Sequence, residues 1–260
     1  MFSAGRTEKE PLGSPNSDNA WNEYVGYEEW KRWANYFEFA QEEAEYYAGE
    51  LAGIPMDGKA VLEIGFGSGS FLAWARGRGA RIAGTELNAR ALEEARRYGV
   101  ELLEPEIEKI ADRYAGRFDL VVAFDVFEHF ELAEIRARLK AVETMLTDGG
   151  HLVLRFPNGQ SPFGLAPQNG DVTHRAALSR EKLEQLSQGT KLRTVRYGGA
   201  FAIRGRWGLK RVVRAGRRLG QWLIGAGLNA VFAQKIPWQA VVVFIMQKAE
   251  RSASLSRSER

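Results

Sequence analysis

Apolar and polar positions recur in blocks along most of the chain, and these blocks predict strands and helices in regular alternation. Short apolar runs predict strands at residues 60–65, 81–87, 100–104, 118–126 and 150–157. Amphipathic segments with helical periodicity follow the first four of them, at residues 69–79, 89–99, 106–116 and 131–146. Short apolar strands separated by helices are typical of a parallel sheet that is covered on both faces. Right-handed crossovers then predict a doubly wound, mostly parallel α/β fold of the Rossmann-like kind.

The alternation ends after Pro157, where the pattern becomes irregular. Residues 158–174 form a loop rich in Gly, Pro and Asn beyond the carboxyl end of a strand, where open α/β sheets bind their ligands. Ser179 is the expected N-cap of a later helix. The insertion at residues 199–237 is too long for a hairpin loop, so we expect it to carry helical structure of its own. The helix and the two strands predicted in this part of the chain cover residues 179–188, 192–198 and 239–249.

The two ends of the chain differ in composition from its middle. Residues 1–20 are polar, rich in Pro, Gly and Ser, and lack the apolar segment of a signal peptide, so we expect a flexible tail. Residues 21–52 are aromatic with a helical pattern and are interpreted as an N-terminal cap that packs on the sheet or covers a ligand. The main domain is expected over residues 53–250, and a second flexible tail over 251–260.

The turn after the first strand, "EIGFGSG", narrows the class of ligand. Its glycines are not followed by Gly-Lys-Ser/Thr, which excludes a Walker loop, and Ser70 stands where a dinucleotide fingerprint has Gly or Ala. Glu63 suits a ligand with positive charge at the strand end, since a pyrophosphate would be repelled there. Glu86 ends the second strand, about 20 residues after the loop, where an acid binds ribose hydroxyls. A ligand with a ribose and a cationic amino-acid end, but no phosphate, is S-adenosylmethionine (SAM).

Four blocks of this sequence resemble one family in the same order and spacing. They are "VLEIGFGSGSFL" with "GTELN", "FDLVVAFDVFEHF", "LTDGGHLVLRFPN" and "THRAALSREKLEQL", between Ala60 and Leu186. The family is the class I SAM-dependent methyltransferases, in the group that includes ubiquinone-biosynthesis O-methyltransferases and surface-glycan methyltransferases. The resemblance implies a seven-stranded sheet whose last strand is antiparallel.

The resemblance also implies roles for individual residues. Glu63 would face the amino end of the methionine moiety, and the glycine loop would pass under the cofactor. Glu86 would hold the ribose. Glu104 is a candidate beside the adenine, and Asp125 would line the pocket. The cofactor-binding set expected in this way is Glu63, Gly65, Phe66, Gly67, Gly69, Glu86, Leu87, Glu104 and Asp125.

Methyl transfer depends mainly on positioning, and a hydroxyl acceptor also profits from a general base. By the same resemblance, His129 in "DVFEHF" faces the transferred methyl group and is the first candidate for that base. His174 closes the loop over the same face and is the second candidate. His151 begins the fifth strand and is expected away from the site. A mechanism without a dedicated base stays open.

The acceptor is less determined by the sequence. The polar loop 158–174 loosely resembles methyltransferases of surface-glycan pathways, so a sugar hydroxyl on a lipid-linked or surface-glycan precursor is our first expectation. A small aromatic or quinone-like molecule is the second. An RNA methyltransferase would show interleaved aromatic and basic residues or an added RNA module, and neither pattern is present. A cofactor-binding protein without catalysis is a further alternative, although the intact glycine loop speaks against it.

Cysteine is absent, which excludes a disulfide framework, a cysteine nucleophile and thiolate metal sites, and fits a cytoplasmic protein. We expect no metal site. The longest uncharged run, around residues 220–234, is shorter than the roughly 20 apolar residues of a spanning helix. The total charge is only +3, but no Asp or Glu lies between Glu184 and Glu250.

Within this acid-free stretch, residues 206–227 combine apolar positions at helical spacing with basic residues on the other face. The apolar positions are Leu209, Val212, Val213, Leu219, Trp222 and Leu223, and the basic ones are Arg206, Lys210, Arg211, Arg214, Arg217 and Arg218. Such a helix can lie in a membrane interface with its arginines on anionic headgroups, which predicts a peripheral contact with the inner face of the membrane. A substrate lid packed on the domain is the alternative.

Overall fold

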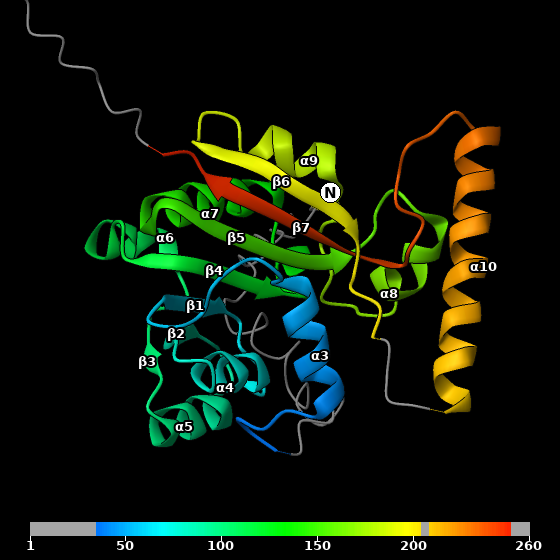
Figure 1. Cartoon of the computed structure of the whole chain (residues 1–260). Coiled ribbons are helices and arrows are strands. Elements are labelled where there is room, and N and C mark those ends of the chain that lie inside the picture. Colours follow the sequence, from blue (N-terminus) through cyan, green and yellow to red (C-terminus); the bar gives the residue numbers. More distant parts are fainter. Residues whose placement is uncertain (1–34, 204–207, 251–260) are drawn as a thin grey trace, which may run out of the picture. The chain divides into compact units, whose positions relative to one another are not determined.

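A computed structural model describes residues 35–203 and 208–250 of the 260-residue chain (Figure 1). The expected tails, residues 1–20 and 251–260, lie outside the described residues. So do residues 21–34 of the expected N-terminal cap and Arg206 of the basic segment.

One seven-stranded sheet organises the domain, in the order β3-β2-β1-β4-β5-β7-β6. Its strands are β1 Ala60–Ile64, β2 Arg81–Thr85, β3 Glu101–Leu102, β4 Phe118–Phe124, β5 Leu146–Pro157, β6 Leu192–Gly199 and β7 Val241–Lys248. The pairings from β3 to β5 are parallel, and β7 is antiparallel to both of its neighbours. The predicted doubly wound, seven-stranded sheet with an antiparallel last strand is therefore confirmed.

The helices between the strands follow the predicted order. They are α3 Gln41–Glu50, α4 Ser70–Arg76, α5 Ala89–Tyr98, α6 Ile107–Ile110 with the 3₁₀ turn η1 Ala111–Tyr114, η2 Phe127–His129, α7 Leu132–Met145, η3 Pro162–Gly164, α8 Leu165–Asn169, α9 Arg180–Leu186 and α10 Leu209–Val231. Ser179 caps α9 as predicted, because its hydroxyl accepts a hydrogen bond from the backbone N–H of Lys182 at 3.2 Å. The insertion between β6 and β7 contains the long helix α10.

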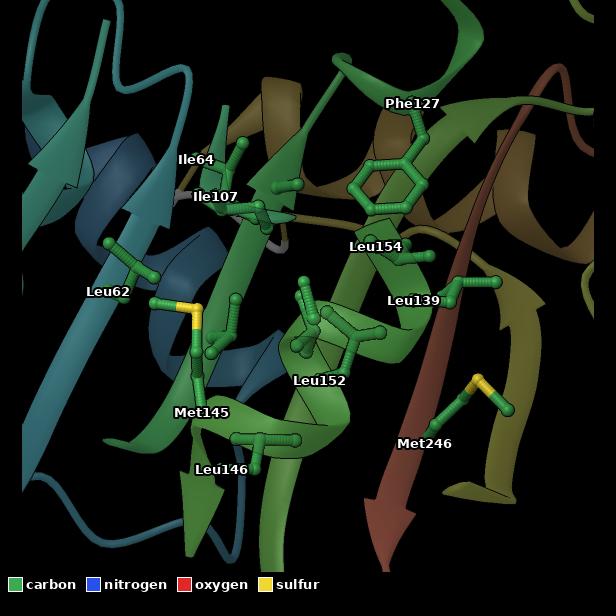
Figure 2. Close-up of a cluster of buried hydrophobic side chains, with 14 of the residues drawn as sticks. Leu62, Ile64, Ile107, Phe127, Leu139, Met145, Leu146, Leu152, Leu154 and Met246 are labelled. Atoms are coloured by element: carbon green, nitrogen blue, oxygen red, sulfur yellow. The ribbon is translucent and has the colours of Figure 1, made fainter. Parts of the chain in front are cut away.

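Each face of the sheet is covered by its own layer of helices (Figure 1). The helices α6, α7 and α9 pack with one apolar cluster, and α3, α4 and α5 pack with the other. Figure 2 shows part of the first cluster, where Leu62 and Ile64 of β1 and Leu154 of β5 join Leu139 of α7. Val61 belongs to the opposite cluster, so β1 is buried on both faces, as the central strand of a parallel sheet must be.

The N-terminal helical pattern ends differently from the prediction. A helix was expected to continue through residues 35–40, but α3 begins only at Gln41. Phe37 has a positive φ of 56°, which a helix does not allow, and its ring stacks on Tyr98 with centroids 4.5 Å apart. Tertiary packing of this aromatic residue has therefore overridden the local helical pattern. The following Tyr47 is buried beside Phe71 of α4.

Candidate active site

The loop between β1 and α4 takes a shape that requires glycine. Gly65, Gly67 and Gly69 all have positive φ angles, of 65°, 54° and 75°. A Cβ atom on Gly69 would lie 2.4 Å from the ring of Phe37, and one on Gly65 would lie 2.8 Å from the Val126 side chain. The glycines thus let the backbone pass close to the strand ends, and the N–H groups of Gly65 and Gly69 donate to the carbonyls of Thr85 and Phe66 at 2.9 and 2.8 Å.

Glu86 fastens this loop to the end of β2. One of its carboxylate oxygens, Oε2, accepts a hydrogen bond from the N–H of Gly67 at 2.8 Å. The other, Oε1, accepts from Leu87 at 2.6 Å and from Asn88 at 3.0 Å. Oε1 already accepts two hydrogen bonds, whereas Oε2 has a further lone pair that could accept from a ribose hydroxyl. The expected contact with a ribose stays a prediction. Phe66 is only 4% exposed and packs against other side chains, whereas Leu87 is 47% exposed.

Glu63 is a buried acid at the end of β1. Its side chain belongs to a residue that is 4% exposed, and its Oε2 atom has no hydrogen-bond partner among the described residues. Burial raises the pKa of this carboxyl well above its ordinary value, Arg155 opposes the shift, and Glu86 adds to it. A buried carboxylate that lacks a partner is stabilised by a cationic ligand, so the site suits a ligand with a positively charged group here.

Asp125 follows β4 and is held by an ion pair with Arg155, and its expected place in the lining of the pocket stays a prediction. Its backbone has a φ of 57°, and its oxygens accept from Nε of Arg155 at 3.0 and 3.1 Å. The guanidinium also lies 4.9 Å from the ring centroid of Phe124 and 5.4 Å from that of Tyr46. The pair fixes the carboxyl ends of β4 and β5 against each other, close to the acid of β1.

A second group of polar side chains lies just beyond Asp125, and we call it the imidazole cluster. Its members are Glu128, His129, Asp171, Thr173 and His174. The two imidazole rings lie edge to face with centroids 4.7 Å apart. The backbone N–H groups of Arg175 and Ala176 donate to the carbonyl of Glu128 at 2.8 and 3.0 Å, which ties the long loop to the end of β4. Both histidines that the sequence predicted as catalytic are therefore brought together.

The hydrogen bonds of the cluster define which ring nitrogen carries a proton. Nδ1 of His174 donates to the carbonyl oxygen of Gln168 at 3.0 Å, because a carbonyl can only accept. The hydroxyl of Thr173 donates to Asp171 at 2.5 Å, so it accepts from Nδ1 of His129 at 2.8 Å. Burial by itself would raise the pKa of Asp171, but two hydrogen bonds from Thr173 and the neighbouring imidazoles lower it below its ordinary value. In their neutral forms both rings therefore have the lone pair on Nε2.

The glycine loop and the imidazole cluster share one edge of the sheet. Strands β1 and β4 run parallel, with Glu63 opposite Val122, and Gly65 lies against Val126, whose carbonyl accepts from the N–H of His129 at 3.1 Å. From β1 the chain adds β2 and β3 on one side, and from β4 it adds β5 on the other side. The position between β1 and β4 is therefore the topological switch point at which doubly wound sheets bind ligands. Glu104 is 56% exposed in its side chain and lies 3.6 Å from Arg113. Its expected place beside an adenine stays a prediction.

Comparison with known proteins settles the family. A family model described as a methyltransferase domain matches residues 32–231, which is more than half of the chain. The chain belongs to the class I SAM-dependent methyltransferase family. The match extends into the insertion and reaches the last residue of α10.

Individual relatives of the methyltransferase domain are more distant. The ubiquinone biosynthesis O-methyltransferase of Acinetobacter baylyi is 29% identical over 113 residues, which are 41% of this chain and 44% of that protein. The protein with the same description from Cronobacter sakazakii is 31% identical over 112 residues, 41% of this chain and 45% of its own length. The chain thus matches less than half of the length of these relatives.

Solved structures show the same fold at lower identity. A SAM-dependent methyltransferase from Archaeoglobus fulgidus has a TM-score of 0.56 at 18% identity, and the match covers 86% of this chain and 99% of that one. The 1,6-didemethyltoxoflavin-N1-methyltransferase of Burkholderia thailandensis, solved with bound 1,6-didemethyltoxoflavin and S-adenosylhomocysteine, has a TM-score of 0.53 at 15% identity and covers 94% of each chain.

Several residues of the methyltransferase site were not predicted from the sequence. Glu128, Thr173 and Asp171 adjoin the two histidines in "FEHF" and "GDVTH", and this adjacency was the available signal. Arg155 is the one charged residue in the apolar strand "HLVLRF", which could have marked it as a half-buried ion-pair partner.

Proposed function

We propose that this methyltransferase transfers a methyl group from SAM to a hydroxyl of a sugar on a lipid-linked or surface-glycan precursor. The observation that carries the proposal is the arrangement at the switch point. A buried, unpartnered carboxylate suited to a cationic cofactor lies on β1, and a pair of imidazoles lies beyond the adjacent strand β4.

The residues present fit SAM. Glu63 would hold the ammonium group of its methionine moiety, because this cation supplies the partner that the buried carboxylate lacks. The amide groups of the glycine loop would lie under the cofactor, and Glu86 and Leu87 would contact the ribose from the end of β2. When bound, SAM would supply a methyl group attached to a positively charged sulfur. Transfer forms a bond between the methyl carbon and the acceptor oxygen, breaks the carbon–sulfur bond and leaves a neutral thioether.

The imidazole cluster would act on the acceptor. A hydroxyl must lose its proton as its oxygen gains the methyl group, and lone pairs on Nε2 of His129 and His174 can assist in one of two ways. They can accept the proton themselves, or they can hold a cation that stabilises the charge on the oxygen. The names of the ubiquinone-biosynthesis relatives support transfer to oxygen. The polar loop that contributes His174 supports a sugar, and a quinone-like phenol is the second candidate.

Transfer of an isotope-labelled methyl group tests the acceptor. The protein is incubated with labelled SAM and, in separate reactions, with lipid-linked saccharides and with catechol or quinol acceptors. We expect a mass gain of one methyl group on a saccharide hydroxyl. Methylation confined to the aromatic set would contradict the glycan proposal and support the second candidate. Transfer to neither set, together with loss of label to a nucleic acid or protein acceptor, would contradict both.

The insertion helix α10 turns its apolar side outward. Residues Leu219, Trp222 and Leu223 are 58%, 66% and 56% exposed. Its polar side contacts the domain, since Arg214 pairs with Glu42 at 2.7 Å and Arg218 donates to the carbonyl of Ala202 at 3.4 Å. A lid would bury its apolar side against the domain, and the orientation of α10 is the opposite. No helix in the described ranges, 35–203 and 208–250, is long and apolar enough to cross a bilayer.

We therefore also propose that α10 lies in the surface of an anionic membrane, at the cytoplasmic leaflet. The apolar side would enter the headgroup boundary, and the flanking Arg211 and Arg217, both exposed, would reach anionic headgroups. The region from 185 to 249 contains no acid that would oppose this contact. Such a contact would bring the sheet edge to an acceptor that is itself attached to a lipid.

Co-sedimentation with vesicles tests this contact. We expect the protein to sediment with anionic vesicles at low salt and to be released at high salt, because the arginine contacts are screened. The triple variant Leu219→Ser, Trp222→Ser, Leu223→Ser should remain in the supernatant. The matched control Gln221→Ser, on the opposite side of the helix, should sediment like the wild type. Recovery of the wild-type protein in the supernatant, or a stable dimer that the triple variant abolishes, would contradict membrane binding.

A further inference from the structure

The imidazole cluster has the composition of a metal-ligand set. One carboxylate oxygen of Glu128 and one ring nitrogen each of His129 and His174 lie within 4.8 Å of one another. Two imidazoles and one carboxylate form the ligand set of many three-ligand sites for first-row divalent cations, which keep an open position for a further ligand. The three residues come from two segments that are far apart in the sequence, β4–η2 and the long loop.

The orientation of the rings strengthens this comparison. Metal-binding histidines commonly donate their second ring N–H to a carbonyl or carboxylate group, which fixes the tautomer and directs the lone pair at the metal. His174 makes this bond to the carbonyl of Gln168, and His129 makes it to Thr173, which in turn donates to Asp171. Nε2 of His174 lies 3.9 Å from the carboxylate of Glu128 and 3.8 Å from that of Asp171. The chain thus supplies an outer shell as well as three ligands.

The burial of these groups explains why a cation would be stabilised there. Glu128 is fully buried, and the His174 and Asp171 side chains are each 6% exposed. Carboxylates and nitrogen lone pairs gathered in a region of low dielectric create a negative potential, which favours a bound cation. A divalent cation would provide two positive charges and would use the lone pairs of both Nε2 atoms.

We infer that Glu128, His129 and His174 bind a first-row divalent metal ion. The inference departs from the sequence-based expectation of no metal site, and its role rests on the proposed function. The cation would lie at the same sheet edge as the glycine loop and would stabilise the negative charge that the acceptor oxygen develops as its proton leaves to solvent. In this arrangement the histidines would be ligands rather than proton acceptors.

Co²⁺ binding tests the inference without SAM or an acceptor. The full-length protein is treated with a chelator, dialysed and titrated with CoCl₂ while its visible d–d absorption is recorded. We expect one bound ion per chain. His129→Ala and His174→Ala should each weaken binding by more than tenfold, and Thr173→Val should weaken it by about 10–100-fold, as losses in the outer shell of metal sites do. The control His151→Ala changes the third histidine and should bind Co²⁺ like the wild type.

Two outcomes would overturn the inference. The first is a wild-type protein that shows no Co²⁺ band although it is folded and binds SAM. The second is a band that persists in the double variant His129→Ala, His174→Ala. If Co²⁺ binds as expected but no acceptor is methylated, the metal site stands and the proposed acceptor fails. Full turnover in the chelator-treated protein would overturn the proposed role of the ion.

Discussion

Replacement of His129 by alanine is expected to lower the turnover of methyl transfer about 100-fold or more and to leave the affinity for SAM unchanged. The side chain lies beyond β4, bonded through Nδ1 to Thr173, and the Glu63 carboxylate and glycine loop do not depend on it. A hundredfold loss corresponds to about 2.7 kcal/mol of transition-state stabilisation. The expected size is the same whether His129 accepts the proton or binds a cation, since either function is lost with the imidazole.

Steady-state turnover and calorimetric SAM binding measure the two parts of this prediction separately. His151→Ala is the matched control, because His151 lies in the middle of β5, four residues before Arg155, and pairs with Leu120 inside the sheet. We expect this control to keep its turnover. Turnover of His129→Ala within a few-fold of the wild type would contradict the role of the imidazole cluster. An equal fall in SAM affinity would point to a disturbed fold of the sheet edge instead.

Replacement of Glu63 by glutamine is expected to weaken SAM binding about tenfold to a hundredfold. The variant keeps the shape of the side chain but loses the charge that would face the ammonium group, and a charge-assisted hydrogen bond contributes roughly 1.5–3 kcal/mol. Isothermal titration calorimetry with SAM at constant pH measures the effect. Glu101→Gln makes the same chemical change at an exposed acid of β3, paired with Arg117, and should bind SAM like the wild type.

The raised pKa of Glu63 adds a pH dependence to this prediction. A cationic ligand favours the ionised carboxylate, so binding to the wild type should release a proton at pH values below the raised pKa, and affinity should fall as the pH falls. Glu63→Gln should lack both effects. Calorimetry in two buffers with different ionisation enthalpies counts the protons. A glutamine variant with unchanged affinity and unchanged proton release would show that Glu63 does not contact the cofactor.

The raised pKa of Glu63 affects the stability of the unliganded protein in the opposite direction from the SAM affinity. Burial raises the pKa in the folded state above its ordinary 4.5, so the folded state holds a proton that the unfolded chain has lost. Stability is therefore lost as the pH rises from about that ordinary value through the raised pKa. Glu63→Gln should melt at a higher temperature than the wild type at pH 8, with a smaller difference at pH 5. If Glu63→Gln binds SAM less tightly but unfolds at a higher temperature, Glu63 contributes to binding and not to the stability of the fold.

Much of the fold was predictable because its signals are local. The strands β1, β2 and β4 were predicted within two residues at each end from short apolar runs, and Ser179 was predicted as a cap from its place before a helical pattern. Other boundaries depend on neighbours. Strand β5 begins at Leu146, four residues before the predicted start, because the pairing of Leu146 with Phe118 extends it. The helix expected through residues 35–40 was wrong, because Phe37 packs on Tyr98 instead.

The candidate site divides in the same way. Glu63, the glycine loop and Glu86 lie within 24 positions of one another, and their spacing along two consecutive strands already indicated a nucleoside-like ligand with a cationic end. In the structure, the hydrogen bond from Gly67 to Glu86 holds the glycine loop against the end of β2. Two histidines could be named from the sequence, but their contact could not, since 45 positions separate them.

The α/β class, the family resemblance and the candidate cofactor residues could be inferred from the sequence, because each is encoded by residues close together in the chain. The folded chain adds that Glu128 and His129 meet His174, that Asp125 pairs with Arg155, and that the apolar side of α10 faces outward. These contacts depend on the register of the sheet. Parallel pairing of β4 with β5, and the return of the long loop over their carboxyl ends, bring distant side chains within a few ångströms. The local periodicity of a sequence does not show which strands pair with each other.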